Sequence, residues 1–432
     1  MIRKSFRNLR IGIKFLLALL INMTHSNNPG NKEKNNVVIV GGNLFNKGAQ
    51  AMTFTVADQI KRIYPNYNIY LLSQKDFKRP DSEKEKYNFK IMPWSGAIKL
   101  NLISSLRVVN KNNTFNHEKE LQMILRKSVF VIDISGYAIS SRFFPRPIDN
   151  LKRSFLYFLP IMVAKYNKIP YFVFPQSMGP FDYKFIHKLI LWPFLVKYLK
   201  YPKKIYAREE KAYEYVKKYS SKNLHLSRDI VLCNDNYIKE NIFSNDFKIN
   251  KYDILENSVA IIPNIKVYER VNEDEFYKLY KKIISRLLTE GKNVYILRHS
   301  FEDLEICKRI KELFNNQEAV RLIVDDLSCL GLENIIKNFD FVVASRYHSV
   351  VHSYRNSIPV LCIGWANKYY ELLDIFSQLN YFCRVNKEID ENAIIQGLDK
   401  IINDFKYEKS VISSKRLELL KNYKFKKLIE IK

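Results

Sequence analysis

The sequence contains little cysteine, glycine or proline. Its five cysteines are an odd number and none stands in a Cys-x-x-Cys pair, which argues against a disulfide framework and against a cysteine-based zinc site. This cysteine usage indicates a reducing, cytosolic compartment. Only 12 glycines and 14 prolines occur among the 432 residues, which excludes collagen-like and linker-rich architectures.

Acidic residues are scarce relative to basic ones. The chain has 44 Asp and Glu against 71 Lys and Arg, a formal net charge of +27. This sign favours anionic partners such as nucleic acid, anionic lipid or phosphorylated small molecules. Without a recognised nucleic-acid-binding motif, no nucleic-acid partner is expected. Residues 1–36 contain seven Lys or Arg and one Glu, and residues 406–432 contain nine and three. These termini suit an anionic membrane surface better than catalysis.

A long apolar run is also missing near the N-terminus. Four basic residues precede an apolar stretch at 11–21, which is shorter than the roughly 20 residues that span a bilayer. Lys14 interrupts it and no small-residue cleavage site follows, which argues against an export signal. The pattern favours an interfacial helix with basic flanks over a frayed tail. It predicts a cytoplasmic protein, peripheral on the inner face of the membrane.

Two internal stretches, 155–164 and 183–202, combine long apolar runs with Lys and Tyr, and Pro160 and Pro193 interrupt them. Two interpretations are open. The stretches are a pair of buried helices in a large core, or they form a basic and aromatic surface that lies on anionic lipid.

What the sequence does contain is enough apolar material for large cores, with 47% hydrophobic and 14% aromatic residues. Short β-branched runs alternate with segments of helical spacing, which predicts parallel sheets with crossover helices. The expected strands are 37–41, 69–73, 129–134, 171–175, 204–207, 258–263, 293–297, 321–324, 341–345 and 359–363.

A polar stretch near 235–255 lacks strong periodicity and marks the expected domain boundary. The fold class is therefore α/β, with two Rossmann-like domains that face a cleft. We expect four parts: a basic N-terminal segment and linker at 1–36, a first domain at 37–240, a second domain at 250–400, and a basic C-terminal helix at 405–432 that folds back onto the first domain.

Candidate site residues follow the strands, because ligands of open parallel sheets bind beyond the carboxyl ends of the strands. The loop after the first strand is not Gly-x-Gly-x-x-Gly, so a dinucleotide site is not indicated. Arg208 opposes a helix dipole, which predicts a facing anion, although a structural pair with a neighbouring Glu is the alternative. In the first half the candidates are Asn46, Gly48, Asp133, Ser135, Gly136, Gln176, Ser177 and Arg208.

In the second half, Asn264 and His299 follow two strands, and Ser345-Arg346-Tyr347-His348 opens a helix after a third. A guanidinium forks two hydrogen bonds onto a carboxylate or phosphate, and a neighbouring imidazole transfers protons near neutral pH. Asp303 lies four residues after His299, so the two are expected to share a helix face. No cluster with metal-ligand spacing is present in the sequence, so no metal is expected.

These pieces occur in an order that resembles the polysaccharide pyruvyl transferase family. The Ser-Arg-x-His stretch, followed by a proline-led strand and Lys368, is the most specific of them. The matching segments are NKGAQAM (46–52), DISGYAIS (133–140), FPQSMGPF (174–181), YAREEKAYEYV (206–216), LRHSFED (297–303) and 340–373.

The resemblance implies a glycosyltransferase-B-like fold and transfer of a pyruvyl group from phosphoenolpyruvate to two hydroxyls of one sugar. The product would be a ketal on an exopolysaccharide or capsule polysaccharide or on its lipid-linked precursor, with phosphoenolpyruvate as co-substrate and no cofactor. By motif match, Arg208 and Arg346 would bind phosphoenolpyruvate with the Tyr347 backbone N–H, and His348 would be the acid/base residue. Asp133 is a weaker candidate for the base, and Lys368 would line the pocket.

Two other functions stay open. A nucleotide-sugar-dependent glycosyltransferase of similar fold would need a ribose and diphosphate site around His299, Ser300 and Asp303. A non-catalytic scaffold is the other alternative, and the retained Arg346 and His348 argue against it.

Overall fold

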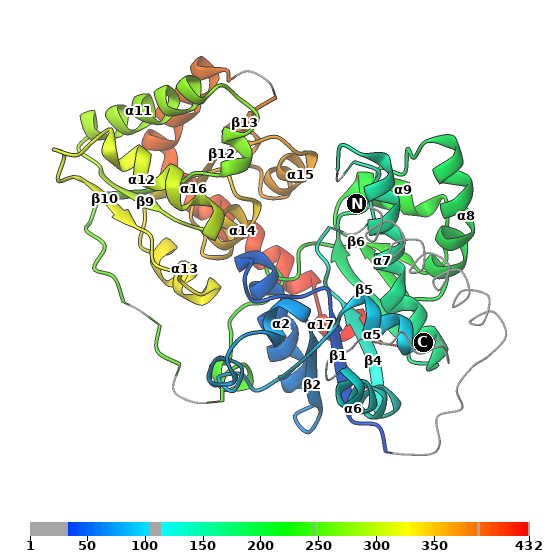
Figure 1. Cartoon of the computed structure of the whole chain (residues 1–432). Helices are drawn as coiled ribbons and strands as arrows, with labels where there is room; N and C mark the ends of the chain where they lie inside the picture. Colours follow the sequence, from blue (N-terminus) through cyan, green and yellow to red (C-terminus); the bar gives the residue numbers. More distant parts are fainter. Residues whose placement is uncertain are drawn as a thin grey trace, which may run out of the picture.

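The structure is a computed structural model in which two α/β domains lie side by side (Figure 1). Each domain is built on a parallel β-sheet. The interfacial helix expected at the N-terminus lies outside the described residues. The described residues are 33–103, 114–137, 139–142, 144–244, 247–249, 251–386 and 389–430.

The first domain is built on a seven-stranded sheet in the order β3-β2-β1-β4-β5-β6-β7, and every neighbouring pair is parallel. Its strands are β1 Asn36–Val40, β2 Asn68–Leu72, β3 Lys90–Met92, β4 Ser128–Asp133, β5 Tyr171–Gln176, β6 Lys204–Ala207 and β7 Leu224–Leu226. Its helices are α2 Lys47–Ile63, α3 Gln74–Phe77, α4 Asp81–Lys84, α5 Gly96–Asn101, α6 Thr114–Arg126, α7 Pro147–Tyr166, α8 Phe185–Leu199 and α9 Glu210–Lys217.

The second domain repeats the arrangement with a six-stranded parallel sheet in the order β10-β9-β8-β11-β12-β13. Its strands are β8 Ser258–Ile262, β9 Asn293–Leu297, β10 Val320–Ile323, β11 Phe341–Ala344, β12 Val360–Gly364 and β13 Phe382–Arg384. Its helices are α10 Ile265–Tyr268, α11 Glu273–Thr289, α12 Leu304–Glu312, α13 Cys329–Ile336, α14 Tyr347–Arg355, α15 Asn367–Ile375 and α16 Glu391–Asn422, and the 3-10 turns of the chain are η1 Lys239–Asn241, η2 Phe301–Asp303 and η3 Leu379–Tyr381.

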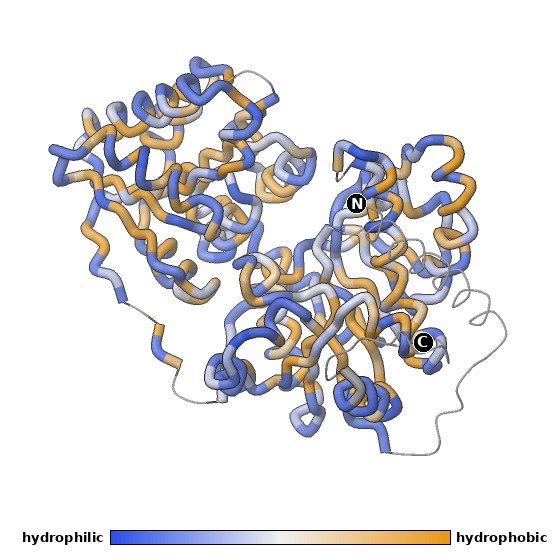
Figure 2. Tube along the Cα trace, viewed as in Figure 1, coloured by the Kyte–Doolittle hydropathy of each residue, from blue (hydrophilic) through white to orange (hydrophobic). Residues whose placement is uncertain are grey.

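The pattern of apolar residues explains how the strands and the helices pack in both domains. The central strands β1 and β8 read NVVIV and SVAII and are buried along their whole length, as expected for a sheet with helices on both faces. Helix α11 buries Phe276, Tyr280 and Ile283, at three- and four-residue spacing, and leaves most of its charged residues exposed. Figure 2 shows this alternation of hydrophobic and hydrophilic residues along the helices. The predicted fold class is confirmed.

The C-terminal helix begins earlier than expected. Helix α16 starts at Glu391, where the Asp390 side chain accepts a hydrogen bond from the Ala393 N–H, so position 405 lies inside it. Its first half buries apolar residues against the second domain. After it, α17 (Phe425–Ile429) packs on β5 of the first sheet, where the Phe425 and Phe174 ring centroids lie 5.3 Å apart.

The stretches 155–164 and 183–202 lie in helices α7 and α8, which contact each other. Each helix fits a different one of the two interpretations. Helix α7 is buried along much of its length, as the core interpretation predicts. Helix α8, at the outer side of the first domain in Figure 1, buries one face and leaves a second apolar face exposed. No helix in the described part of the chain is long and apolar enough to cross a membrane.

Candidate active site

The two domains meet where the strands of both sheets end. Residues that follow β1, β6 and β7 of the first domain lie against the start of α14 in the second, and α2 contacts α13. The site is therefore built from residues of both chain halves, and neither domain supplies it alone.

Arg208 follows β6 and is buried at the centre of this contact. Its Nη1 donates to Asp229 Oδ2 at 3.0 Å, and its Nη2 donates to Ser177 Oγ at 2.7 Å and to the Gly136 carbonyl at 3.3 Å. Burial opposes the charge, but the acidic groups around it outweigh burial and raise the pKa of Arg208. The guanidinium is therefore charged and rigidly held.

Glu209 completes the surroundings of this guanidinium. Its Oε1 lies 3.5 Å from Arg208 Nε and also accepts a hydrogen bond from Ser177 Oγ. The structural Arg–Glu pair that the sequence left open is therefore present, and it coexists with an Arg208 that faces the second domain.

The Tyr347 ring lies close to two cations. Its ring lies 4.6 Å from the Arg208 guanidinium carbon and 4.9 Å from Lys368 Nζ, which comes from α15. Burial, and then the charge of Arg208, lower the pKa of Lys368 to about 8. Two positive groups thus contact one aromatic ring at the domain interface.

His348 is the next residue on α14. Its Nε2 lies 3.7 Å from Asp229 Oδ2 and is buried without a hydrogen-bond partner among the described residues. Burial lowers the pKa of His348 well below its usual value, and Arg208, His352 and Lys368 lower it further. The imidazole is therefore neutral at neutral pH in the free protein and has a ring nitrogen available.

Gly48 explains why the imidazole lies so close to the first domain. A Cβ at this position would be 2.0 Å from His348 Nδ1, so only glycine allows the approach. Asn46 fixes the loop, because its side chain caps α2 by accepting hydrogen bonds from the Gly48 and Ala49 N–H groups.

Arg346, the N-cap residue of α14, is clamped by acids. Its Nε and Nη2 donate to the two carboxylate oxygens of Asp303 at 2.9 and 2.6 Å, and Nη2 lies 3.3 Å from Glu302. Burial opposes its charge, but Asp303 raises the pKa of Arg346. His299 lies before the 3-10 turn η2 that Asp303 ends, so the expected shared helix face does not exist. The chain turns at Ser300 instead.

His299 belongs to a row of three imidazoles. Its ring centroid is 5.8 Å from that of His352, which is 6.4 Å from that of His348. His352 Nδ1 contacts Glu333 Oε1 at 2.8 Å. Burial, and then His352, lower the pKa of His299. Within the described ranges, no group of three or more His, Cys, Asp or Glu residues is arranged to hold a metal ion.

Asp133 ends β4 and is fully buried. Its Oδ1 accepts hydrogen bonds from the Ser135 N–H and Oγ–H at 2.9 and 2.5 Å, and its Oδ2 accepts one from the Tyr171 hydroxyl at 2.9 Å. Burial raises the pKa of this carboxyl. Asp133 thus holds the Ser135–Gly136 loop in place through hydrogen bonds. The carboxylate that lies beside His348 is that of Asp229.

The other predicted residues hold the strand ends. The Gln176 carbonyl accepts the Arg208 N–H at 3.2 Å, and the Gln176 side chain donates to the Tyr157 hydroxyl at 3.1 Å. Asn264 caps α10 and donates to the Ser345 carbonyl at 2.8 Å. Gln176 therefore supports Arg208, and Asn264 supports the strand that precedes Arg346.

Sequence reasoning missed Asp229 and His352. Asp229 follows β7, whose three residues are too short for a periodicity signal. His352 lies four residues after His348 on α14, and this helical spacing is a signal that could have found it.

The fold defined by these two domains is that of glycosyltransferase-B proteins. A glycosyltransferase from Rickettsia africae ESF-5 is 12% identical with a TM-score of 0.53, and the match covers 92% of this chain and 96% of that one. A UDP-GlcNAc 2-epimerase from Methanocaldococcus jannaschii is 11% identical with a TM-score of 0.52 and coverage of 89% and 99%. At these identities the likeness concerns the fold.

The family is defined by the sequence model of polysaccharide pyruvyl transferases, which matches residues 46–367 and includes Arg208, Arg346 and His348. The chain belongs to the polysaccharide pyruvyl transferase family. It is therefore a transferase of polysaccharide biosynthesis with a sugar or polysaccharide acceptor. Among curated proteins, none matches the chain.

The contact between Gly48 and His348 makes a direct prediction. Gly48→Ala displaces the imidazole from its buried position, so the His348 pKa rises toward its ordinary value, as an NMR titration of the histidine ring would measure. Gly331→Ala is the control, because a Cβ there meets only ordinary contacts from 3.5 Å outward. An unchanged His348 titration in Gly48→Ala would contradict the role of this contact.

Proposed function

We propose that the protein transfers a pyruvyl group from phosphoenolpyruvate to two hydroxyls of one sugar and releases phosphate. The observation that carries this proposal is the cluster of Arg208, Tyr347 and Lys368 beside the neutral His348. It joins two cations and a proton-transfer group at one interface. Family membership supports the same reaction class.

The donor fits this charge pattern. Phosphoenolpyruvate carries a carboxylate and a phosphate on a three-carbon frame, so it needs cations on more than one side. In the proposal, Arg208 and Lys368 bind it beside Tyr347, whose N–H opens α14, and Arg346 at the start of the same helix is the third cation. Asp229 and Asp303 keep the two guanidiniums in place.

The reaction balances with these groups. The first sugar hydroxyl adds to C2 while the C3 methylene takes a proton and becomes a methyl group. The second hydroxyl then forms the other C2–O bond as the bond between C2 and the phosphate oxygen breaks. Of the two hydroxyl protons, one balances the proton gained by C3 and the other leaves with the phosphate.

His348 is the proposed proton donor to C3. Its imidazole is neutral in the free protein because burial and neighbouring cations disfavour a further positive charge. A bound donor with several negative charges offsets these cations and raises the pKa of His348, so protonation follows donor binding. Asp229 at 3.7 Å stabilises the imidazolium. We assign Asp133 a positioning role, because Ser135 and Tyr171 occupy its oxygens.

The glycosyltransferase alternative receives less support. It relied on His299, Ser300 and Asp303 as polar groups for a ribose and a diphosphate. In the structure Asp303 is bound by Arg346 and His299 is buried beside His352. Of the three residues, only Ser300 lines the hollow between the strand ends of the two domains.

His348→Ala tests the proposed chemistry. We expect a folded protein whose phosphate release from phosphoenolpyruvate falls by about 100-fold or more, the usual cost of a lost general acid. His225→Ala, at an exposed position on β7, is the matched control and keeps full activity. Wild-type turnover in His348→Ala would refute the assignment.

The pH dependence tests Lys368. Because its pKa is lowered to about 8, its positive charge is present below this value and lost above it. We expect kcat/KM for phosphoenolpyruvate to fall as the pH rises through about 8. Lys368→Arg keeps the positive charge at higher pH, so the fall in kcat/KM should move to higher pH. If kcat/KM of Lys368→Arg falls at the same pH as that of the wild type, another group is responsible for the fall.

We also propose that the protein docks on anionic membranes through α8. Its exposed face carries Phe185, Ile186 and Leu189, which are 76%, 68% and 59% exposed, followed by Ile190 and Trp192. Exposed lysines lie beside them at 184, 188 and 200. An apolar face with basic flanks has the composition of an interfacial helix.

The double variant Ile186→Glu/Leu189→Glu tests this surface. Each side chain contributes about 1.5–3 kcal/mol when buried in lipid, so we expect binding to phosphatidylglycerol vesicles, measured by sedimentation, to fall at least about tenfold. Leu417→Glu, at an exposed apolar position on α16, is the control. Equal vesicle binding by the double variant and the wild type would exclude α8 as the docking face.

A further inference from the structure

Two cations of the proposed donor site belong to different domains. Arg208 lies just before α9 of the first domain, and Lys368 is the second residue of α15 in the second domain. Carboxylates hold the Arg208 guanidinium in place. The Lys368 ammonium, in contrast, forms no hydrogen bond or ion pair with the described residues and lies 4.9 and 5.7 Å from the ring centroids of Tyr347 and Tyr369. Its position therefore depends on how α15 is placed.

Helix α9 receives its N-terminal cap from the other domain. Its N-cap residue, Glu209, makes no capping hydrogen bond, since its side chain is engaged with Ser177 and Arg208. Instead, Oε2 of Glu371 on α15 accepts a hydrogen bond from the Glu210 N–H at 2.8 Å. A carboxylate suits this place because unpaired N–H groups and the helix dipole give a helix N-terminus a partial positive charge.

The same carboxylate also braces the start of α15. Ala366, the N-cap residue of α15, makes no side-chain capping bond. The Glu371 Oε1 atom accepts a hydrogen bond at 2.7 Å from Asn367 Nδ2, one helical turn away, and Asn367 Oδ1 accepts one at 3.3 Å from Lys211 Nζ of α9. Asn367 and Glu371 therefore lie on either side of Lys368 in the chain, and both bind the first turn of α9.

Two further polar contacts between the domains involve neither cation. Lys47 Nζ of α2 lies 2.6 Å from Asp326 Oδ1, and Gln50 Oε1 accepts a hydrogen bond from the Cys329 N–H at 2.7 Å. These contacts join α2 to the residues around the start of α13. Glu371 and its partners, in contrast, lie within three residues of one or the other cation in the chain.

We infer that Glu371 is a positioning residue that fixes the spacing of the two cations across the domain interface. It caps the helix that follows Arg208 and braces the helix that carries Lys368, so one side chain sets both positions. Glu371 acts through the two helices and is assigned no contact with the donor. This inference rests on the proposed function, because that function makes the two cations the donor-binding pair.

The charge of Lys368 reports on this contact. Burial, and then Arg208, lower the pKa of Lys368 to about 8, and Arg346 lowers it further, whereas Glu209 and Asp229 raise it. Release of α15 from α9 hydrates the ammonium and moves it away from the Arg208 charge. Because these are the two largest effects, the pKa of Lys368 then rises toward its ordinary value.

An NMR titration of the lysine side chains in the full-length protein tests the inference, with the Lys368 signal assigned by its loss in Lys368→Arg. We expect the pKa of Lys368 to rise above about 8 in Glu371→Ala. It stays close to the wild-type value in Glu371→Gln, because the amide oxygen accepts the same bond from the Glu210 N–H. An unchanged Lys368 pKa in Glu371→Ala would overturn the inference.

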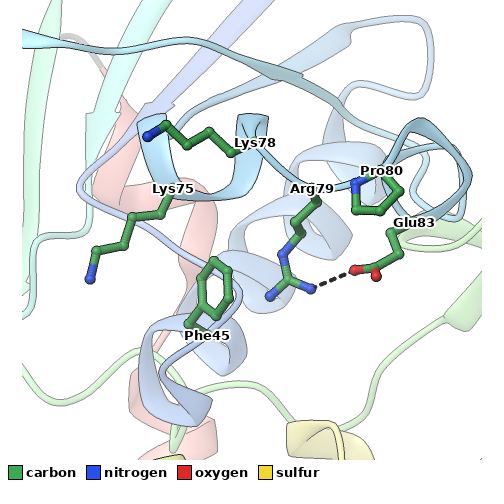
Figure 3. Close-up of a pocket in the computed structure, with 6 residues that line it drawn as sticks. All are labelled: Phe45, Lys75, Lys78, Arg79, Pro80 and Glu83. Atoms are coloured by element: carbon green, nitrogen blue, oxygen red, sulfur yellow. Dashed lines mark hydrogen bonds and ion pairs between the residues drawn. The ribbon is translucent and has the colours of Figure 1, made fainter.

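Glu83→Ala is the matched control. Glu83 is a partly exposed carboxylate in a hollow of about 550 Å³ in the first domain, and its Oε2 lies 2.9 Å from Arg79 Nη1 (Figure 3). Its loss removes an ion pair within one domain, so we expect the Lys368 pKa and the phosphoenolpyruvate affinity to keep their wild-type values. A rise of the Lys368 pKa equal to that in Glu371→Ala would also overturn the inference, because loss of any carboxylate would then suffice.

Donor binding separates this inference from the proposed function. We expect Glu371→Ala to weaken phosphoenolpyruvate binding, measured by calorimetry, by about fivefold or more, the usual effect of a lost helix cap. The NMR titration requires neither donor nor transfer. A raised Lys368 pKa with unchanged phosphoenolpyruvate affinity would therefore support the coupling of the two helices and refute the donor role of Lys368. Weaker binding with an unchanged Lys368 pKa would overturn the coupling.

Discussion

The buried ion pair between Arg208 and Asp229 is the interaction on which the site depends. Both residues follow strands of the first domain, and both touch the second, Arg208 through the Tyr347 ring and Asp229 through His348. Removing one partner of such a pair leaves an uncompensated buried charge, at a cost of about 3–5 kcal/mol. The pair therefore orients the cation, places a carboxylate beside the imidazole, and fixes how the domains meet.

Much of the fold was predictable from the sequence, because buried β-branched runs alternate with amphipathic segments in both halves. The positions of Arg208 and His348 after their strands followed from the same rhythm. The contacts between residues that lie far apart in the chain did not follow from this rhythm. Arg346 pairs with Asp303 across 43 positions, and no local pattern encodes that distance. The sequence did not point to Asp229 because the preceding strand β7 has only three residues. The predicted C-terminal helix started later than α16 does because the prediction followed the basic second half of that helix.

The positive charge of the chain divides into separate roles. Arg208 and Arg346 are held by carboxylates, so their charge is fixed in direction and locally compensated. The exposed lysines at positions 184, 188 and 200, by contrast, flank the apolar face of α8. The same net charge thus includes rigidly held guanidiniums in the interior and exposed lysines beside an apolar surface on the outside.

The return of the chain through α16 and α17 to the first sheet also affects motion. The domains are joined once between β7 and β8 and a second time where α16 leads to α17. Two connections restrict the relative motion of the domains more than a single linker would, as long as Phe425 stays packed on Phe174.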